Sequence, residues 1–203
     1  MLDLIIVRHG QSVADIEGRM EGRANFPLTD LGKEQAEKLA YWLKQKETFD
    51  YIISSPLKRA SETAQIIGRV CSKEITYDVR LMEWNNGLIA GLLKSEANEK
   101  YPIPKGGRKY FQRIFEGESL IDFRARAEEF TAELLDKYAI AKEDRRIVII
   151  THGGTINMII HSFLNMPIKN NITVSSGDTG VHVLRIKRED RIIVSLNVNK
   201  HLE

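Results

Sequence analysis

The chain has 203 residues, of which 42% are hydrophobic and 29% are charged. This balance excludes an intrinsically disordered chain, which combines few hydrophobic residues with a high net charge. The formal net charge is only +2, and the 30 basic residues do not gather in one run, so we expect no binding to nucleic acid. The length favours a single domain that spans residues 1–203.

Signals for export, membrane insertion and disulfide bonding are weak. Residues 1–7 are hydrophobic but too few for a secretory signal peptide, and no segment reaches the roughly 20 apolar residues that cross a bilayer. Cys71 is the single cysteine, and it follows a hydrophobic helical segment, where a structural thiol is commoner than a reactive one. We therefore predict a cytoplasmic protein with no membrane partner, and the sequence leaves a homodimer open.

The first part of the chain alternates short β-branched runs with amphipathic segments. The run after Met1 is almost continuously hydrophobic, as in a strand that is buried on both faces. Thr29 is placed to cap a helix, and Pro56 suits a helical first turn. The predicted elements are strands over 2–7, 51–54 and 75–77 and helices over 29–46 and 57–70.

The second part repeats this alternation after a segment rich in glycine and proline, residues 78–118, where we expect loops and short helices. The further predicted elements are helices over 119–137 and 153–164 and strands over 146–151, 181–186 and 192–198. A charged turn between the last two strands indicates a hairpin at one sheet edge. The pattern predicts an α/β fold, a three-layer α/β/α sandwich around a mostly parallel sheet.

Histidines and arginines follow three of the predicted strands. Arg8 and His9 come after the first strand, Arg59 after the second, and His152 after the strand that ends at Thr151. Ligands of open α/β sheets bind beyond the carboxyl ends of the strands, so we expect these side chains to meet there. Because guanidinium groups bind phosphate oxygens in pairs, the set predicts a phosphate pocket.

Glycines support the same pocket. Gly10 follows the first histidine, and Gly153 and Gly154 follow the second at the start of a predicted helix. Without side chains they let backbone N–H groups approach an anion closely, and a helix N-terminus favours negative charge.

A metal site is the chemical alternative, because neutral imidazole is a common ligand and Asp15 and Glu17 lie nearby in the sequence. The arginines beside the histidines would repel a cation, so we predict no metal. No nucleotide-binding glycine motif is present, so we also expect no cofactor.

The segment Leu4-Ile-Ile-Val-Arg8-His9-Gly10-Gln-Ser12 resembles the signature of the histidine phosphatase superfamily, which includes the cofactor-dependent phosphoglycerate mutases. Other segments resemble further family blocks, in the family's order. They are Pro27–Gly32, Ser54–Ala60 with Thr63-Ala64, Gly117–Ser119 and Ile149–Gly153. The resemblance covers essentially the whole chain and implies a phosphoglycerate mutase-like fold.

The resemblance implies that His9 is the nucleophile that takes the phosphoryl group, while Arg8, Arg59 and His152 clamp its oxygens. Glu83 fills the position of the acid that protonates the leaving oxygen and later activates water. The rest of the expected phosphate-binding set is Gly10, Ser12, Asp15 and Gly153. The implied enzyme is a metal-independent phosphomonoester hydrolase that acts on a small phosphorylated metabolite through phosphohistidine.

Two departures from the family pattern concern the substrate more than the reaction. Relatives commonly carry asparagine at the position of Asp15, where a carboxylate repels a phosphate dianion unless it is protonated, turned away or paired with a cation. Residues 86–91 lack the acidic and aromatic residues often found between the family's glycines.

Two other functions stay open on the same fold. Family mutases are typically longer and carry segments that close over a bisphosphorylated intermediate, so we favour a phosphatase over a phosphoglycerate mutase. A non-catalytic binding module is the second alternative, and the complete set of expected catalytic residues argues against it.

Overall fold

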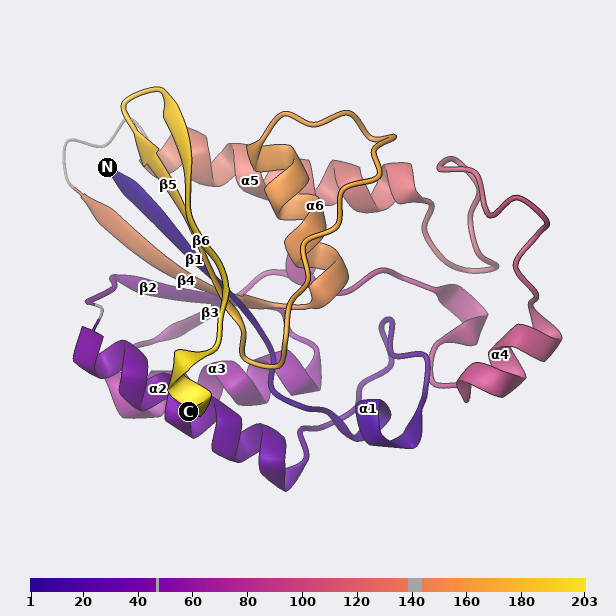
Figure 1. Ribbon diagram of the computed structural model, residues 1–203, viewed down its shortest axis with the longest axis horizontal. Coiled ribbons are helices and arrows are strands. Elements are labelled where there is room, and N and C mark those ends of the chain that lie inside the picture. The colour runs from indigo at the N-terminus through magenta and orange to yellow at the C-terminus, as the bar shows by residue number, and fades with distance from the viewer. Residues whose placement is uncertain (47, 139–143) are drawn as a thin grey trace.

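The computed structural model describes residues 1–46, 48–138 and 144–203. In these ranges six strands form one sheet in the order β3-β2-β4-β1-β5-β6 (Figure 1). The strands are β1 (Leu2–Arg8), β2 (Tyr51–Ser54), β3 (Ile75–Tyr77), β4 (Arg145–Thr151), β5 (Val181–Lys187) and β6 (Asp190–Val198). The pairs from β3 to β1 are parallel, whereas β5 runs antiparallel to both β1 and β6. The mostly parallel sheet and its terminal hairpin were both predicted correctly.

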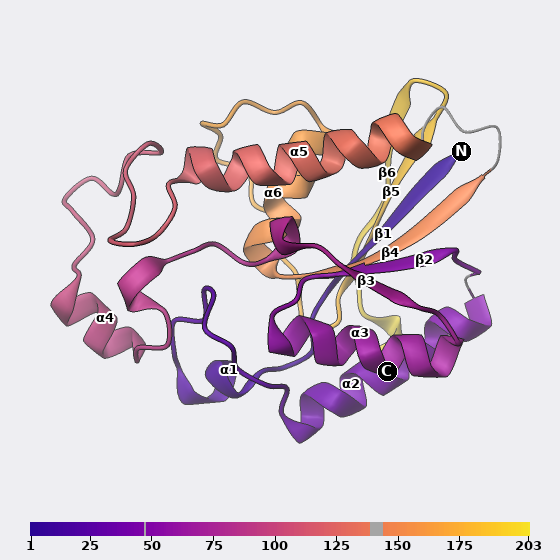
Figure 2. The same cartoon turned by 180° about the vertical axis from the view of Figure 1, so that it is seen from behind.

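Helices cover the two faces of this sheet. One face carries α2 (Asp30–Lys46) and α3 (Lys58–Cys71), and the other carries α5 (Leu120–Tyr138) and α6 (Gly153–Phe163), as Figures 1 and 2 show from opposite sides. The predicted three-layer sandwich is confirmed. None of the helices within the described residues is long and hydrophobic enough to cross a membrane.

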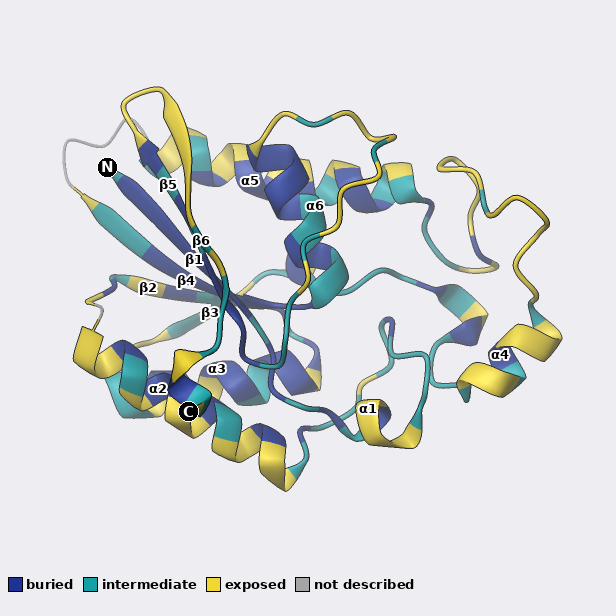
Figure 3. Cartoon of the chain, in the orientation of Figure 1, coloured by how far each residue is buried: buried dark blue, intermediate teal, exposed yellow. Residues whose placement is uncertain are grey.

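The hydrophobic core lies in two layers, one on each side of the sheet. Leu2, Leu4 and Ile6 of β1 join the cluster under α5 and α6, whereas Ile5 and Val7 join the cluster under α2 and α3. Successive side chains of a strand point to opposite faces, so a strand that is covered on both faces is hydrophobic at nearly every position. The exception in β1 is the buried Asp3, which pairs with Arg185 at 2.7 Å. Figure 3 shows the central strands buried along most of their length.

Side-chain caps place the starts of α2 and α5 close to their predicted positions. Thr29 Oγ1 accepts a hydrogen bond from the Gly32 backbone N at 3.0 Å, which confirms the predicted cap of α2. Before α5, Ser119 and Asp122 bond each other's backbone N–H groups, at 2.9 Å and 3.2 Å. The N-cap residues of α3 and α6 make no such side-chain hydrogen bond, yet these helices also begin within about two residues of the predicted position.

Two short helices lie beyond the carboxyl ends of the central strands, at the lower right of Figure 1. The first, α1 (Val13–Glu17), was not predicted, since five residues are too few to show a helical period. The second, α4 (Lys94–Lys100), lies with η1 (Val79–Leu81) and η2 (Gly87–Ile89) in the segment where short helices were expected. A last 3-10 turn, η3 (Lys200–Leu202), ends the chain beside α2.

Candidate active site

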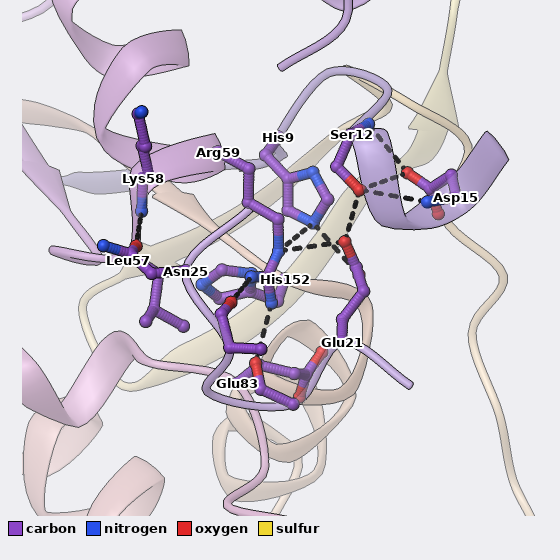
Figure 4. A network of polar contacts seen from close by, with 12 residues as sticks. His9, Ser12, Asp15, Glu21, Asn25, Leu57, Lys58, Arg59, Glu83 and His152 are labelled. Carbon is purple, nitrogen blue, oxygen red and sulfur yellow. Dashed lines mark hydrogen bonds and ion pairs between the residues drawn. The ribbon is translucent and has the colours of Figure 1, made fainter. Parts of the chain in front are cut away.

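The sheet brings both histidines and the arginines to one place, at the carboxyl ends of β1, β2 and β4. His9 follows β1, and its backbone N donates to the carbonyl of Thr151 at the end of β4 at 3.0 Å. The His9 and His152 rings lie with their centroids 5.0 Å apart (Figure 4). Arg59 reaches the same point from the first turn of α3. The parallel order of neighbouring strands produces this convergence, as the sequence indicated.

The His9 ring is held in the tautomer that a nucleophile needs. Its Nδ1 lies 2.8 Å from the carbonyl oxygen of Gly10, which can only accept, so Nδ1 carries the proton and Nε2 carries the lone pair. Burial, together with the charges of Arg59 and Arg8, holds the pKa of His9 well below its ordinary value. The ring is therefore neutral near pH 7, and its Nε2 is unprotonated.

Arg59 presents one edge of its guanidinium group to this lone pair. Its side chain is completely buried, and its Nη1 and Nη2 donate to the carbonyls of Ala24 and Gly22 at 3.0 Å and 2.9 Å. The remaining Nε lies 3.2 Å from His9 Nε2 and 3.3 Å from Glu21 Oε1. A buried cation needs such partners, and these two carbonyls fix the direction of the group.

His152 is the N-cap residue of α6 and is fully buried. Its Nε2 lies 2.8 Å from Ser55 Oγ, and its Nδ1 has no hydrogen-bond partner among the described residues. When the Ser55 hydroxyl donates to Nε2, the ring proton is on Nδ1 and can bond a phosphoryl oxygen. Burial and the charge of Arg59 hold the pKa of His152 well below its ordinary value, so the ring is neutral as well.

Glu83 lies beside His152, on the segment that follows η1 (Figure 4). Its Oε1 accepts from the backbone N of Trp84 at 2.7 Å, and its Oε2 accepts from the backbone N of Gly154 at 2.9 Å. A Cβ at position 154 would overlap the carboxyl group, so only glycine permits this approach. In contrast, a Cβ at Gly153 would meet nothing within 4 Å, which leaves the start of α6 accessible to a ligand.

Arg126 of α5 fixes the backbone of the Glu83 segment, a role that sequence reasoning missed. Its guanidinium donates to the carbonyls of Arg80 and Met82 at 2.6 Å each and to that of Glu83 at 2.9 Å. An ion pair with Glu118 at 2.7 Å balances its charge. Nothing local marks this arginine for the role, because the three carbonyls that it bonds lie more than 40 residues away in the chain.

Asp15 is paired rather than directed at the nucleophile. Its Oδ2 accepts from Ser12 N at 2.8 Å and so caps α1, while its Oδ1 lies 3.6 Å from Arg8 Nη2. Arg8 also donates to the carbonyl of Ser176 at 2.7 Å and lies 3.5 Å from Asp178. Of the three states that the sequence left open for Asp15, the structure has the pairing with a cation.

Glu21 stands closer to the nucleophile than Asp15 does, and sequence reasoning missed it. Its Oε2 lies 3.9 Å from His9 Nε2, and its Oε1 lies 2.5 Å from Ser12 Oγ. Burial raises the pKa of this carboxyl group. The available signal was a carboxylate inside the glycine-containing loop 18–22, which follows the His-Gly pair and helix α1 in the chain.

The two acidic residues that the sequence offered as metal ligands, Asp15 and Glu17, are both engaged by other groups. Glu17 lies 2.5 Å from Arg19, and Asp15 is held by Ser12 and Arg8. Within residues 1–46, 48–138 and 144–203, no three His, Cys, Asp or Glu side chains are grouped as ligands of one ion.

A cavity of about 480 Å³ adjoins Glu21 and Glu83. Its wall combines hydrophobic and cationic side chains with carboxylates. The wall includes Asp15, Arg19, Glu21, Glu83, Trp84, Lys94 and Arg108. Its volume suits the alcohol part of a small phosphorylated molecule.

The C-terminal segment supports the loop behind His9. Asn197 Oδ1 accepts from the backbone N of Gly177 at 2.8 Å, and His201 Nε2 lies 2.8 Å from Thr179 Oγ1. Thr179 N in turn donates to the carbonyl of His9 at 3.2 Å. The last residues of the chain therefore help to position its first catalytic candidate.

The sequence profile of the histidine phosphatase superfamily, branch 1, matches residues 4–199. The chain belongs to this superfamily. It is 28% identical over 208 aligned positions to phosphoserine phosphatase 1 of Hydrogenobacter thermophilus, covering 100% of this chain and 95% of the relative. It is 33% identical to phosphoglycerate mutase-like protein 4 of Arabidopsis thaliana, over 77% of this chain and 69% of the relative.

A solved relative agrees with both the family and the fold. The mycobacterial glucosyl-3-phosphoglycerate phosphatase, determined with VO3, is 27% identical and superposes with a TM-score of 0.83. The match covers 96% of this chain and 98% of the other. The family and the phosphoglycerate mutase-like fold expected from the motifs are confirmed.

Proposed function

We propose that the chain is a phosphomonoester hydrolase that acts on a small phosphorylated metabolite through a phosphohistidine on His9. The observation that carries the proposal is the buried, neutral His9 ring, whose Nδ1 is bonded to a carbonyl and whose Nε2 faces Arg59. Relatives named for phosphoserine and glucosyl-3-phosphoglycerate phosphatase activity support a small substrate.

In the first step His9 Nε2 attacks phosphorus, and the bond from phosphorus to the ester oxygen breaks. Glu83, as a carboxylic acid, gives its proton to that oxygen, and the alcohol leaves. Arg59, Arg8 and the Nδ1–H of His152 stabilise the charge on the phosphoryl oxygens. These cationic and N–H groups supply the stabilisation that a metal ion provides in other phosphatases, so the enzyme needs no metal.

In the second step water attacks phosphorus while the Glu83 carboxylate takes a proton from it. The bond between phosphorus and His9 Nε2 breaks, and phosphate leaves with the histidine restored. The backbone N–H groups of Trp84 and Gly154 keep the carboxylate oriented for this step. One residue can therefore serve as the acid and then as the base.

A mutase is the second candidate, because one of the relatives is named a phosphoglycerate mutase-like protein. In a mutase the phosphohistidine passes its phosphoryl group to another hydroxyl group instead of water. Incubation of the phosphorylated protein with and without monophosphoglycerate separates a hydrolase from a mutase. A hydrolase releases inorganic phosphate at the same rate under both conditions.

Hydrolysis of an aryl phosphate, followed by a panel of phosphorylated metabolites, tests the proposal. Rapid quenching should trap an acid-labile, alkali-stable phosphoryl adduct on His9, and His9→Ala should lose both adduct and turnover. His161→Ala is the matched control, since His161 lies on α6 and bonds the carbonyl of Ile172 instead of the site. Unchanged turnover in His9→Ala would refute the assignment and favour a non-catalytic module.

Other expectations from the sequence stay predictions. They are the single domain, the cytoplasmic location, the lack of nucleic-acid and membrane partners, and the homodimer that was left open.

A further inference from the structure

The carboxyl group of Glu21 lies where a phosphoryl group has to bind. It contacts three groups of the expected phosphate site: Arg59 Nε at 3.3 Å, Ser12 Oγ at 2.5 Å and His9 Nε2 at 3.9 Å (Figure 4). An attacking nitrogen approaches phosphorus to about 3–3.5 Å, which brings phosphoryl oxygens into the same shell around Nε2. Glu21 must therefore share a proton with the substrate or give up its place.

The hydrogen bonds around Ser12 indicate that the carboxyl groups of Asp15 and Glu21 share one proton. The Ser12 hydroxyl has one proton but faces two carboxyl oxygens, Glu21 Oε1 at 2.5 Å and Asp15 Oδ2 at 3.0 Å. With both groups ionised, one of these oxygen pairs would have no proton between them. A proton on Glu21 resolves this conflict, because Glu21 then donates to Ser12 and Ser12 donates to Asp15.

Glu21 rather than Asp15 is the group that holds this proton. Asp15 already accepts from the backbone N of Ser12 through Oδ2 and faces Arg8 Nη2 through Oδ1, so each of its oxygens has a donor partner. Glu21 is more buried, and burial and the charge of Asp15 raise its pKa while Arg59, Ser12 and Arg8 lower it. Charged side chains across the adjoining cavity are Arg19, Glu83, Lys94 and Arg108.

We propose that Glu21 is a phosphate-binding residue that admits the substrate only as a neutral carboxylic acid. When the anion binds, neutral Glu21 turns its proton from Ser12 to a phosphoryl oxygen, beside Arg59, and the Ser12 hydroxyl still donates to Asp15. As a carboxylate, Glu21 pairs with Arg59 itself and repels the dianion. Anion binding therefore takes up one proton at a pH above the pKa of Glu21. This inference rests on the proposed phosphatase site but not on turnover.

Inorganic sulfate provides a test that needs no catalysis, because it stays a tetrahedral dianion between about pH 5 and pH 8. We would measure its affinity by calorimetry across this range for the wild type, Glu21→Gln and the exposed control Asp136→Asn on α5. Thermal unfolding of each variant establishes that it is folded. Burial holds the pKa values of His9 and His152 well below their ordinary value in each protein, so the difference between the curves reports Glu21.

Once the pH exceeds the pKa of Glu21, each further pH unit should weaken sulfate binding to the wild type and to Asp136→Asn by about tenfold relative to Glu21→Gln. The amide donates at every pH, so Glu21→Gln should match the wild type at the acidic end and bind more tightly at the alkaline end. Parallel curves, or weaker binding by Glu21→Gln at high pH, would overturn the inference even if aryl phosphate is hydrolysed. If the curves are as expected but aryl phosphate is not hydrolysed, the result would support the role of Glu21 in anion binding and count against the phosphatase function.

Discussion

The substitution Gly154→Ala should displace the carboxyl group of Glu83 and leave the stability of the fold nearly unchanged. A Cβ at this site would lie 3.1 Å from Glu83 Cδ and 3.2 Å from Oε2, and it would overlap Oε1. The carboxyl group has to move by about an ångström, and such a displacement costs on the order of 100-fold in rate. We expect that loss in kcat/KM for alkyl phosphates. Aryl phosphates, whose leaving group needs little protonation, should lose less than about tenfold.

The fold should tolerate the same change. Alanine is favoured over glycine in a helix by about 0.5–1 kcal/mol, which offsets the loss of one hydrogen bond of about 0.5–1.5 kcal/mol between Gly154 N and Glu83. Urea unfolding should therefore give a free energy within about 1 kcal/mol of the wild type.

Kinetics in a Glu83→Ala background decide whether the effect passes through Glu83. With the carboxyl group gone, Gly154→Ala should cause no further loss on alkyl phosphates. Equal losses on alkyl and aryl substrates, or an additive loss in the Glu83→Ala background, would refute the reasoning.

Three further predictions follow from other contacts. Turnover should survive exhaustive chelation and be inhibited by vanadate, and recovery of a chelated, inactive enzyme by a divalent metal would contradict the mechanism. Asp15→Asn keeps the cap of α1 but frees Arg8 from an ion pair worth less than about 1 kcal/mol. KM for an aryl phosphate should therefore fall about threefold. An unchanged KM would show that Arg8 does not bind substrate. Burial lowers the pKa of His182 to about 4, below its value of 6.5 when unfolded. The unfolded chain therefore binds the proton more readily, and the free energy of unfolding should fall as the pH drops from 6.5 to about 4. In urea titrations over this range, His182→Gln should flatten the slope, and an unchanged slope would assign it to other groups.

Local patterns in the sequence determined most of the fold. Buried strands and amphipathic helices each have a period that a short window reveals, and the caps at Thr29 and Ser119 involve neighbours three residues away. The placement of His9, Arg59 and His152 at strand ends was equally visible, because a parallel sheet directs its carboxyl ends to one edge. Glu83 was found only through the family resemblance, since its own neighbours describe an ordinary loop carboxylate.

The tertiary structure alone decided which of these groups touch. The pairing of Asp15 with Arg8, the hold of Arg126 on the Glu83 segment and the position of Glu21 against His9 and Arg59 all depend on how loops cross above the sheet. Such contacts join residues with no fixed spacing along the chain, so no period or motif records them. Burial has the same origin: the pKa of Glu21 is raised chiefly because the packed chain excludes water around its carboxyl group.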